Sequence, residues 1–485
     1  MKNMVKLSGV EWQPFTIFLE QKVTYSMQKQ KQGYQIDMVN GPLAGKILLF
    51  ALPLMLSSLL QLLFNAADVV VVGRFAGKEA LAAVGSNGSL INLFVNLFIG
   101  LSVGTNVVIA RDLGAGKTEN VRKSVHTSVT LALIGGILLA VAGFFLSRQM
   151  LELMSSPPDV IELSALYLRI YFLGMPGNLL YNFGAAILRA QGDTRRPLYY
   201  LSIAGVANVV LNLIFVIPFH MSVAGVALAT IISQYISAAL VLLTLMRDDG
   251  LMHLNLKELT LDWHTVQRIM RVGLPAGLQS TLFSISNVVI QSSINSFGSA
   301  VVAGSSAAGN IEGFIYVCTN AFHQAALTFV SQNYGAGQSK RVDRIAILCL
   351  CYGACISLVL GNLIYYFGTP LTALYAPGET EVIAQSVVRL GYVAAFQFLC
   401  ALMDIMVGVL RGLGYSVIPM IVSLVGSCAF RLLWIATIFQ WYTTPSCLYI
   451  SYPISWAITA LAHVIFFFIV RKNAYRHLQP AKATK

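Results

Sequence analysis

The sequence predicts an all-α integral membrane protein of about twelve transmembrane helices, arranged as two six-helix lobes. Three observations predict this fold class: the hydrophobic composition, the spacing of the basic residues, and an internal repeat. Of the 485 residues, 56% are hydrophobic and 11% are charged, whereas a soluble chain usually carries about 25% charged residues. Because a helix that crosses the ~30 Å hydrocarbon core takes roughly 20 apolar residues, a chain of this length holds about twelve spans and short loops.

Apolar runs bounded by Gly, Pro or charged residues mark the expected spans. In the first half these runs fall near residues 47–72, 84–110, 126–147, 164–188, 198–219 and 222–246. In the second half they fall near residues 269–297, 303–330, 344–368, 386–410, 417–441 and 449–470. We therefore expect an N-lobe at 47–246 and a C-lobe at 269–470, joined by a linker at 247–268 that carries a short interfacial helix. Residues 1–46 and 471–485 are expected to form terminal tails.

Basic residues gather in every second segment between the expected spans. The positive-inside rule places such segments in the cytoplasm, which puts both termini there and requires an even number of spans. This distribution accounts for the net charge of +12, and because no recognition motif is visible we expect no nucleic-acid partner. The basic residues concerned are Arg111, Lys117, Arg122, Lys123, Arg189, Arg195, Arg196, Arg247, Lys257, Arg268, Arg271, Lys340, Arg341, Arg344, Arg411, Arg471, Lys472 and Arg476.

The two halves of the chain resemble each other at a nearly constant offset, which indicates an internal repeat. The matching segments, each pair 221 or 222 positions apart, are Pro53 with Pro275, 114–116 with 335–337, and 188–197 with 410–419. Because each half holds an even number of spans, both halves insert in the same orientation and are related by a pseudo-twofold axis along the membrane normal. This geometry predicts a central cavity that alternating access could expose to either side.

A set of polar residues lies at similar depth in the first half. Counted from the charged ends of their spans, Asp68 lies roughly 9 Å deep, Asn212 roughly 12 Å, Thr230 roughly 15 Å and Asn208 roughly 18 Å. Asn208 and Asn212 are four positions apart and therefore share one helix face. A carboxylate with amide and hydroxyl oxygens suits Na⁺ or a transported proton. The alternative is that Asp68 caps or snorkels at a helix end while the asparagines bond backbone groups between helices.

The residues around these positions resemble the multidrug and toxic compound extrusion (MATE) family, within a superfamily that includes flippases for lipid-linked precursors. The resemblance is carried by LPLMLSSLLQLLFNAADVVVVGRFAG, VGTNVVIARDLGAGK and LRAQGDTRRP, and by their second-half counterparts GLPAGLQS, VSQNYGAGQSKR and LRGLGYSVIPM. It covers essentially residues 40–470. It implies a secondary active antiporter of the plasma membrane that exports small organic, often cationic, compounds in exchange for Na⁺ or H⁺, with no other cofactor.

The resemblance also implies a cation or proton site in the first lobe, made by an Asp, two Asn or Asp positions and a Thr. These positions map by motif onto Asp68, Asn208, Asn212 and Thr230. One branch of the family carries an acidic residue in the seventh span. Because 269–297 holds no acidic residue, a second-lobe Na⁺ site of that kind is not expected.

Other polar positions are candidates for the substrate cavity or for structural pairs. Asp404 in the tenth span, its repeat counterpart Asn182, and Gln279 in the seventh span are candidate cavity residues; a carboxylate held by neighbouring polar groups is the alternative for Asp404. Glu312 and Arg431 both fall in the outer half of the C-lobe. Because an isolated charge inside the membrane is costly, we expect these two to pair.

Two other functions compete with efflux. A flippase for lipid-linked oligosaccharide or a related precursor shares the fold class, but it is expected to line its cavity with several basic residues that bind pyrophosphate. A membrane-embedded enzyme requires paired carboxylates, a Ser–His pair or clustered metal ligands at one depth. The sequence offers scattered single ionisable groups instead, and no ATPase fingerprint. We therefore expect a transporter rather than an enzyme, sufficient as a monomer.

Overall fold

The computed structural model describes residues 34–154 and 160–476, and helices make up nearly all of both ranges. The helices of the first half are α2 (Leu43–Val71), the π-helical turn η1 (Val72–Ala76), α3 (Lys78–Gly114), α4 (Thr118–Leu153), α5 (Ile161–Leu173), α6 (Met175–Ala190), α7 (Arg195–Val216) and α8 (Ser222–Met246). Within the described ranges no residue forms a β-strand. Of the two expected tails, 1–33 and 477–485 lie outside the described residues.

The second half repeats this pattern. Its helices are α9 (Trp263–Asn295), α10 (Ser299–Gly335), α11 (Ser339–Tyr366), α12 (Gly368–Ala373), α13 (Thr380–Tyr392), α14 (Gln397–Gly412), α15 (Val417–Ser423), the π-helical turn η3 (Leu424–Ala429), α16 (Phe430–Ala436), α17 (Ile438–Trp441) and α18 (Pro445–Arg476). The last helix therefore continues past the expected lobe boundary at residue 470.

Eight of the described helices are long and apolar enough to cross a membrane, and α13 with α14, bent by 49°, makes a ninth such span. The remaining expected spans are α9, α10, and α5 with α6. Helix α5 ends before Gly174 and α6 begins just ahead of Pro176, so this span is broken next to a proline, which has no backbone N–H to donate. Helix α10 is buried along most of its length, which explains why it needs less apolar sequence than a lipid-facing helix.

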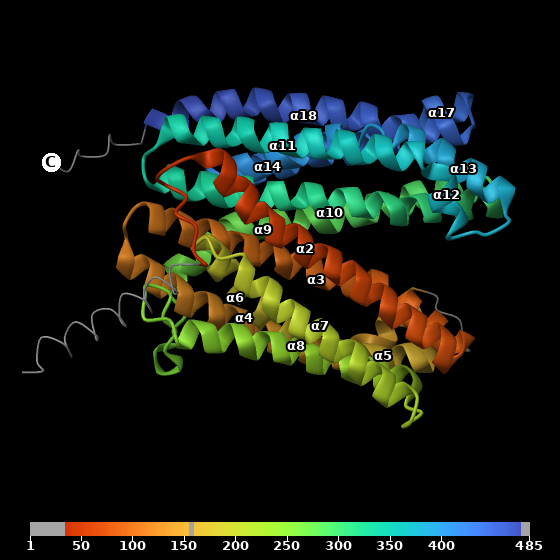
Figure 1. The fold of residues 1–485 in the computed structure, drawn as a ribbon, viewed down its shortest axis with the longest axis horizontal. Coiled ribbons are helices and arrows are strands. Elements are labelled where there is room, and N and C mark those ends of the chain that lie inside the picture. The colour runs from red at the N-terminus through yellow and green to blue at the C-terminus, as the bar shows by residue number, and fades with distance from the viewer. Residues whose placement is uncertain (1–33, 155–159, 477–485) are drawn as a thin grey trace, which may run out of the picture.

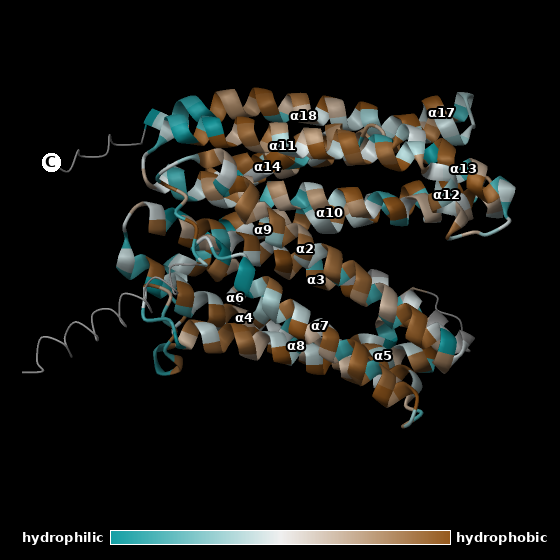
Figure 2. Cartoon of the chain, viewed as in Figure 1, coloured by the Kyte–Doolittle hydropathy of each residue, from teal (hydrophilic) through white to brown (hydrophobic). Residues whose placement is uncertain are grey.

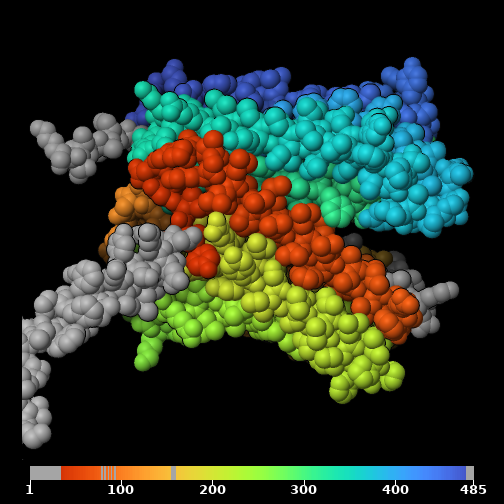
Figure 3. Space-filling model, viewed as in Figure 1, coloured from red at the N-terminus to blue at the C-terminus, as the bar shows by residue number. Residues whose placement is uncertain are grey.

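The two halves form two lobes that meet at one end and part at the other (Figure 1). Both described chain ends lie at the end where the lobes meet. Hydrophilic residues gather in the loops of that same end, whereas hydrophobic residues line the helices between the two ends (Figure 2). In the space-filling view the lobes are separated by a notch at the opposite end (Figure 3). The fold is therefore open on one face of the membrane and closed on the other.

Helix α2 belongs to both lobes. Its first half packs into the C-lobe core, where Phe50 meets Phe329 of α10 edge to face with ring centroids 5.4 Å apart. Its second half packs on the N-lobe helix α7, where the ring of Phe64 fills the space that Gly205 leaves by having no side chain. Pro53 lies inside α2 without ending the helix, near the point where it passes from one lobe to the other.

Helix α9 is the counterpart of α2 and packs closely on α3 of the other lobe. Gly100 and Gly104 of α3 face Gly273 and Gly277 of α9, and a Cβ at any of the four would overlap the backbone of the facing helix. Small residues at this spacing allow helix backbones to approach closely inside a membrane. The glycine contact, together with the α2–α10 contact, therefore closes one end of the molecule.

The two Gly-Ala-Gly segments, 114–116 and 335–337, are tight turns. Gly116 follows α3 with φ at 67° and Gly337 follows α10 with φ at 74°, conformations that favour glycine. The preceding glycines lie against the opposite turn: Gly114 contacts the backbone of Gln332, and Gly335 contacts the backbone of Arg111. The repeat thus places equivalent turns against each other across the lobe boundary.

The linker is fastened to the N-lobe. In place of the expected short helix it holds a single 3-10 turn, Leu256–Glu258. The backbone N–H of Asn255 donates to His126 Nε2 of α4 over 3.1 Å, and Arg122 of α4 forms an ion pair with Glu258. Met252 of the linker is almost fully buried in a hydrophobic core cluster of the N-lobe. The linker therefore moves with the N-lobe up to the start of α9.

Candidate functional site

Four polar side chains meet in the N-lobe, between α2, α7 and α8. Asn212 Nδ2 donates to Asp68 Oδ1 over 2.5 Å and lies 3.4 Å from Asn208 Oδ1. Asn208 Nδ2 lies 3.5 Å from Thr230 Oγ1, which itself donates to the Val226 carbonyl over 2.9 Å. The structure therefore brings the four residues mapped by depth and motif into one connected cluster.

The centre of this cluster is buried and holds an unsatisfied acceptor. Asn212 is 0% exposed and Asn208 is 5% exposed. The Oδ1 atom of Asn212 is buried and has no hydrogen-bond partner among the described residues. A buried polar atom without a partner costs roughly 1–3 kcal/mol and calls for an explanation such as an ion or a water. This orphaned oxygen fits a cation that binds beside Asp68.

A stacked aromatic pair on α5 includes a residue that lies near the cluster. Tyr167 and Tyr171 stack with ring centroids 6.0 Å apart, and Tyr167 is close enough to Asp68 to interact with its charge. Tyr167 also belongs to the apolar cluster that holds Val71 at the end of α2. Sequence reasoning did not single out Tyr167, because an aromatic residue in an apolar run carries no signal of its own.

The oxygen atoms of this cluster are of the types that suit one small cation. Asp68 supplies one carboxylate, and Asn208, Asn212 and Thr230 supply neutral oxygens. Hard cations such as Na⁺ prefer carboxylate, amide and hydroxyl oxygens, and a carboxyl group in the same place can instead take up a proton. Both ions would neutralise Asp68.

The expected pair of Glu312 with Arg431 is wrong. Both carboxylate oxygens of Glu312 accept hydrogen bonds from Arg389 of α13, over 3.0 Å and 2.9 Å. Arg389 also donates to Ser305 Oγ over 2.6 Å. Glu312 therefore has a partner from a neighbouring helix of its own lobe, and its charge is already matched. The signal that could have found Arg389 is its position inside the apolar run 386–410.

Arg431 is held by uncharged groups instead. Its Nε donates to Ser455 Oγ over 2.9 Å, and its guanidinium lies over the ring of Tyr452 at 4.1 Å from the centroid. The residue is 4% exposed, and its Nη2 is buried without a hydrogen-bond partner in the described part of the chain. Arg431 is thus a buried positive charge that aromatic rings stabilise.

The three candidate cavity residues do not form one site. Gln279 Oε1 accepts from Arg411 over 2.8 Å, and Asp404 interacts electrostatically with the same arginine. The carbonyl of Asp404 also accepts from His323 Nδ1 over 2.6 Å. Asn182, in the other lobe, donates to Asn178 one turn away. Asp404 and Gln279 thus share a polar cluster of the C-lobe, and Asn182 lies apart from it.

Arg411 belongs to that cluster rather than to a loop. The alternation of basic residues along the chain predicted a loop position for Arg411, but α14 continues to Gly412 and Arg411 is 6% exposed. Its Nε is buried without a partner among the residues described. The C-lobe therefore holds two buried arginines, Arg411 and Arg431, and a mostly buried one, Arg389, whereas the N-lobe cluster is built around a carboxylate.

Polar bonds across the lobe boundary hold the closed end. Arg268 of α9 donates from both terminal nitrogens to the two oxygens of Asp112 of α3, each over 2.8 Å. Thr328 of α10 donates to Asn106 of α3 over 3.0 Å. A bidentate arginine–carboxylate pair combines charge with fixed geometry, so Asp112 and Arg268 fix the register of the two lobes.

The sequence matches the family model MatE twice, over residues 53–214 and 275–435. The two matches begin at the prolines of α2 and α9, and they confirm the internal repeat. Together they cover well over half of the chain.

Known relatives match the chain along most of their length. It is 29% identical to the "Probable multidrug resistance protein YpnP" of Bacillus subtilis (strain 168), over 84% of this chain and 90% of that protein. It is 26% identical to the "Probable multidrug resistance protein NorM" of Thermotoga maritima, over 80% and 84%. A solved structure described as an outward-facing conformation of a multidrug resistance MATE family transporter superimposes with a TM-score of 0.84 at 23% identity, over 90% of this chain and 98% of that one.

Proposed function

The chain belongs to the MatE family of multi-pass membrane transporters, and we propose that it is a secondary active multidrug efflux antiporter. It exports organic, often cationic, compounds in exchange for Na⁺ or H⁺ by alternating access. The names of its relatives support multidrug efflux. The end where the lobes meet faces the cytoplasm, with both termini, because the basic loops lie there. The monomer is the working unit.

The observation that carries this proposal is the buried N-lobe cluster around Asp68. It joins one carboxylate to neutral oxygens from two further helices, and the unpartnered Oδ1 of Asn212 leaves an acceptor for a cation. A cluster of this kind has no evident structural need for a charge, since a neutral residue would satisfy the same amide. A carboxylate inside the membrane typically marks an ion pathway or a proton relay.

Coupling follows from the position of Asp68 on α2. The first half of α2 packs in the C-lobe core, and its second half is tied to α7 through the Asp68–Asn212 bond. Neutralisation of Asp68 by Na⁺ or H⁺ weakens a charge-assisted hydrogen bond and so changes how α2 is held between the lobes. An ion can shift the inward–outward equilibrium only by its differential affinity for the two states. The differential contact proposed here is the Asp68–Asn212 bond.

Proteoliposomes that contain the purified protein test this proposal. Ethidium is supplied on the cytoplasmic side of the protein. A Na⁺ gradient or an H⁺ gradient directed toward that same side is imposed separately. Transport against the ethidium gradient with one ion gradient supports antiport and identifies the ion. If neither gradient drives ethidium or other organic cations, the proposal is wrong.

A second candidate is the flippase for lipid-linked oligosaccharide or a related precursor. Two buried arginines of the C-lobe favour it, because Arg411 and Arg431 both carry buried nitrogens without a partner in the described residues. Such groups suit a phosphate or pyrophosphate cargo. Flipping of a fluorescent lipid diphosphate by the same proteoliposomes, without ethidium transport, would place this candidate first.

A further inference from the structure

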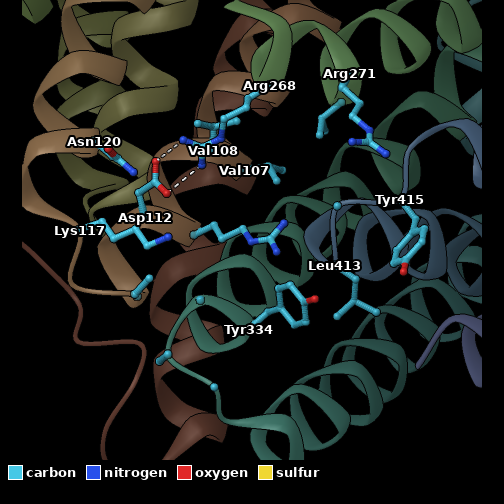
Figure 4. Close-up of a pocket in the computed structure, with 18 of the residues that line it drawn as sticks. Val107, Val108, Asp112, Lys117, Asn120, Arg268, Arg271, Tyr334, Leu413 and Tyr415 are labelled. Atoms are coloured by element: carbon cyan, nitrogen blue, oxygen red, sulfur yellow. Dashed lines mark hydrogen bonds and ion pairs between the residues drawn. The ribbon is translucent and has the colours of Figure 1, made fainter. Parts of the chain in front are cut away.

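A cavity of about 1020 Å³ lies at the closed end, between the two lobes (Figure 4). It is formed where the end of α3 and its Gly-Ala-Gly turn face the start of α9, the end of α10 and the segment after α14. Its lining includes Arg111, Lys117, Arg268, Arg271, Tyr334 and Tyr415. None of the four residues of the N-lobe ion cluster lines it, so it is a separate site.

The lining of this cavity carries an excess of positive charge. Four of the lining residues are Arg or Lys, and one, Asp112, is acidic. Asp112 is already bound through both oxygens by Arg268, as the dashed lines of Figure 4 mark. Arg111, Lys117 and Arg271 have no ion-pair partner among the described residues. Three cations thus face one concave space without a counter-charge.

The cationic groups are supported from both lobes. The guanidinium of Arg111 lies over the ring of Tyr334, 4.6 Å from the centroid, and Tyr334 is 6% exposed. Figure 4 shows Arg271, Tyr334 and Tyr415 around the same space. Arg111 comes from the N-lobe helix α3, whereas Arg271 comes from α9, the first helix of the C-lobe. A ligand in the cavity therefore touches both lobes at once.

Membrane topology explains why basic residues occur at this end, but not why three unpaired ones converge on one cavity. Solvated loop charges can avoid one another, whereas charges held around a concavity repel and focus a positive potential. Guanidinium groups match phosphate oxygens in pairs, and lysine adds a point charge. The volume is at the upper end of the roughly 300–1,000 Å³ that small-molecule pockets usually have.

We propose that this cavity binds a phosphate-bearing anion between Arg111 and Arg271, with Lys117 as a third contact, and that the bound anion holds the lobes closed at this end. Because the contacts come from both lobes, the anion binds the closed form and not a form in which the lobes part here. It therefore slows opening to this side. This site does not depend on which compound is exported or on which ion couples.

Binding of potassium pyrophosphate to the purified full-length protein in neutral detergent tests the proposal. We expect saturable calorimetric binding at low ionic strength, about tenfold weaker in Arg271→Gln and in Arg111→Gln, because each removes a charge-assisted contact. Lys340→Gln is the matched control, since Lys340 is an exposed basic residue at the same end and outside the cavity. Lack of binding, or equal losses in Lys340→Gln and Arg271→Gln, would overturn the proposal.

Hydrogen exchange tests the effect on the lobes, and two lipid compositions identify the source of the phosphate. Pyrophosphate should slow amide exchange at 110–116 and 268–272 in wild type and leave Arg271→Gln unchanged; equal exchange with and without pyrophosphate would contradict the closing role. In nanodiscs, equal pyrophosphate affinity in phosphatidylcholine and phosphatidylglycerol supports a soluble anion. Weaker pyrophosphate binding in phosphatidylglycerol than in phosphatidylcholine means that the lipid headgroup competes for the site. If this difference between the lipids disappears in Arg271→Gln, the site is assigned to a lipid headgroup.

Discussion

Asn212 on α7 donates its side-chain amide to Asp68 on α2 over 2.5 Å, although the two residues lie 144 positions apart. The bond joins a helix of the N-lobe to the one helix whose first half packs in the C-lobe core. Its strength depends on the charge of Asp68, because a carboxylate accepts hydrogen bonds about twice as strong as a neutral group does. In the proposed mechanism, this bond links ion binding to the arrangement of the lobes.

Replacement of Asn212 by leucine should uncouple the transporter. Asn212→Leu removes the donor to Asp68, and a hydrogen bond to a charged group contributes roughly 1.5–3 kcal/mol. We expect ion-driven ethidium export to fall at least about tenfold, at unchanged protein levels in the membrane. Asn362→Leu is the matched control, because Asn362 is exposed on α11 and its amide returns to the Leu358 carbonyl of the same helix. Similar export by both variants would contradict the role of the bond.

The Glu312–Arg389 pair makes a prediction about stability. In each residue about a tenth of the side chain is exposed, 10% and 13%, so Glu312→Leu leaves a buried guanidinium without its carboxylate. Loss of one partner of such a pair costs roughly 3–5 kcal/mol. We expect a clear drop in the thermal unfolding temperature in detergent, largely restored in the double variant Glu312→Leu/Arg389→Leu. Restoration by Arg431→Leu instead would show that Arg431 is the true partner.

The glycine contact between α3 and α9 predicts the effect of one added methyl group. Gly100→Ala places a Cβ against the backbone of Gly277, and such overpacking typically costs about 1–3 kcal/mol. The closed end should loosen, which hydrogen exchange would detect as faster exchange of amides 269–277. Gly313→Ala is the control, because a Cβ there meets nothing within 4 Å. Unchanged exchange in Gly100→Ala would argue against this contact as the closure.

Asp262 gives the start of α9 a pH dependence. Its carboxylate accepts from the Thr265 N–H over 2.8 Å as an N-cap, and hydrogen bonding from Thr265 holds the pKa of Asp262 below its usual range. A lowered pKa in the folded state means that the capping stabilisation is present above the ordinary pKa of about 4 and is lost as pH falls through the lower folded value.

Amide exchange in the first turn of α9, corrected for intrinsic rates, checks this prediction. Wild type should lose protection between pH 7 and pH 3, whereas Asp262→Asn, which caps without a charge, should not. Asp262→Ala should cost about 1 kcal/mol relative to wild type near pH 7, and this difference should shrink as pH falls. Equal pH dependence in wild type and Asp262→Asn would contradict the assignment.

Much of the fold was predictable because apolar composition and repetition are both visible along the chain. The offset of 222 between Pro53 and Pro275 reappears in the two family matches, which begin at those prolines. Positions of helix breaks were less predictable. Pro176 marks a true break between α5 and α6, whereas Pro53 and Pro275 lie inside continuous helices. Proline removes one donor in each case, and the surrounding packing decides whether the helix bends or ends.

The N-lobe cluster could be predicted because depth and the family resemblance point to the same four residues. Asn208 and Asn212 share a face by their spacing, and Asp68 and Thr230 lie at similar distances from their helix ends. The partner of Glu312 could not be predicted in the same way. Depth in the membrane does not distinguish Arg431 from Arg389 as the partner of Glu312. The partner depends on which face of each helix is turned toward the interior of the lobe. That rotation is set by packing, and a single sequence does not specify it.

The buried position of Arg411 and the closed-end cavity could not be predicted from the sequence either. Arg411 ends an apolar run, and such a residue looks like a loop cation unless the helix is known to continue inside the lobe. The cavity gathers Arg111 and Arg271 from opposite lobes. Their convergence depends on how the lobes meet, which local pattern does not encode.

The proposed coupling depends most directly on Asp68, and one comparison tests it. Ethidium efflux is measured in cells that express wild type, Asp68→Asn or Glu379→Gln at equal membrane levels, with Na⁺ and pH gradients imposed separately. Glu379→Gln is the control, because it removes an exposed carboxylate outside the described spans. We expect one gradient to drive export by wild type and Glu379→Gln, and Asp68→Asn to respond to that gradient no longer. Gradient-driven export by Asp68→Asn at the wild-type rate would contradict the coupling role of the N-lobe cluster.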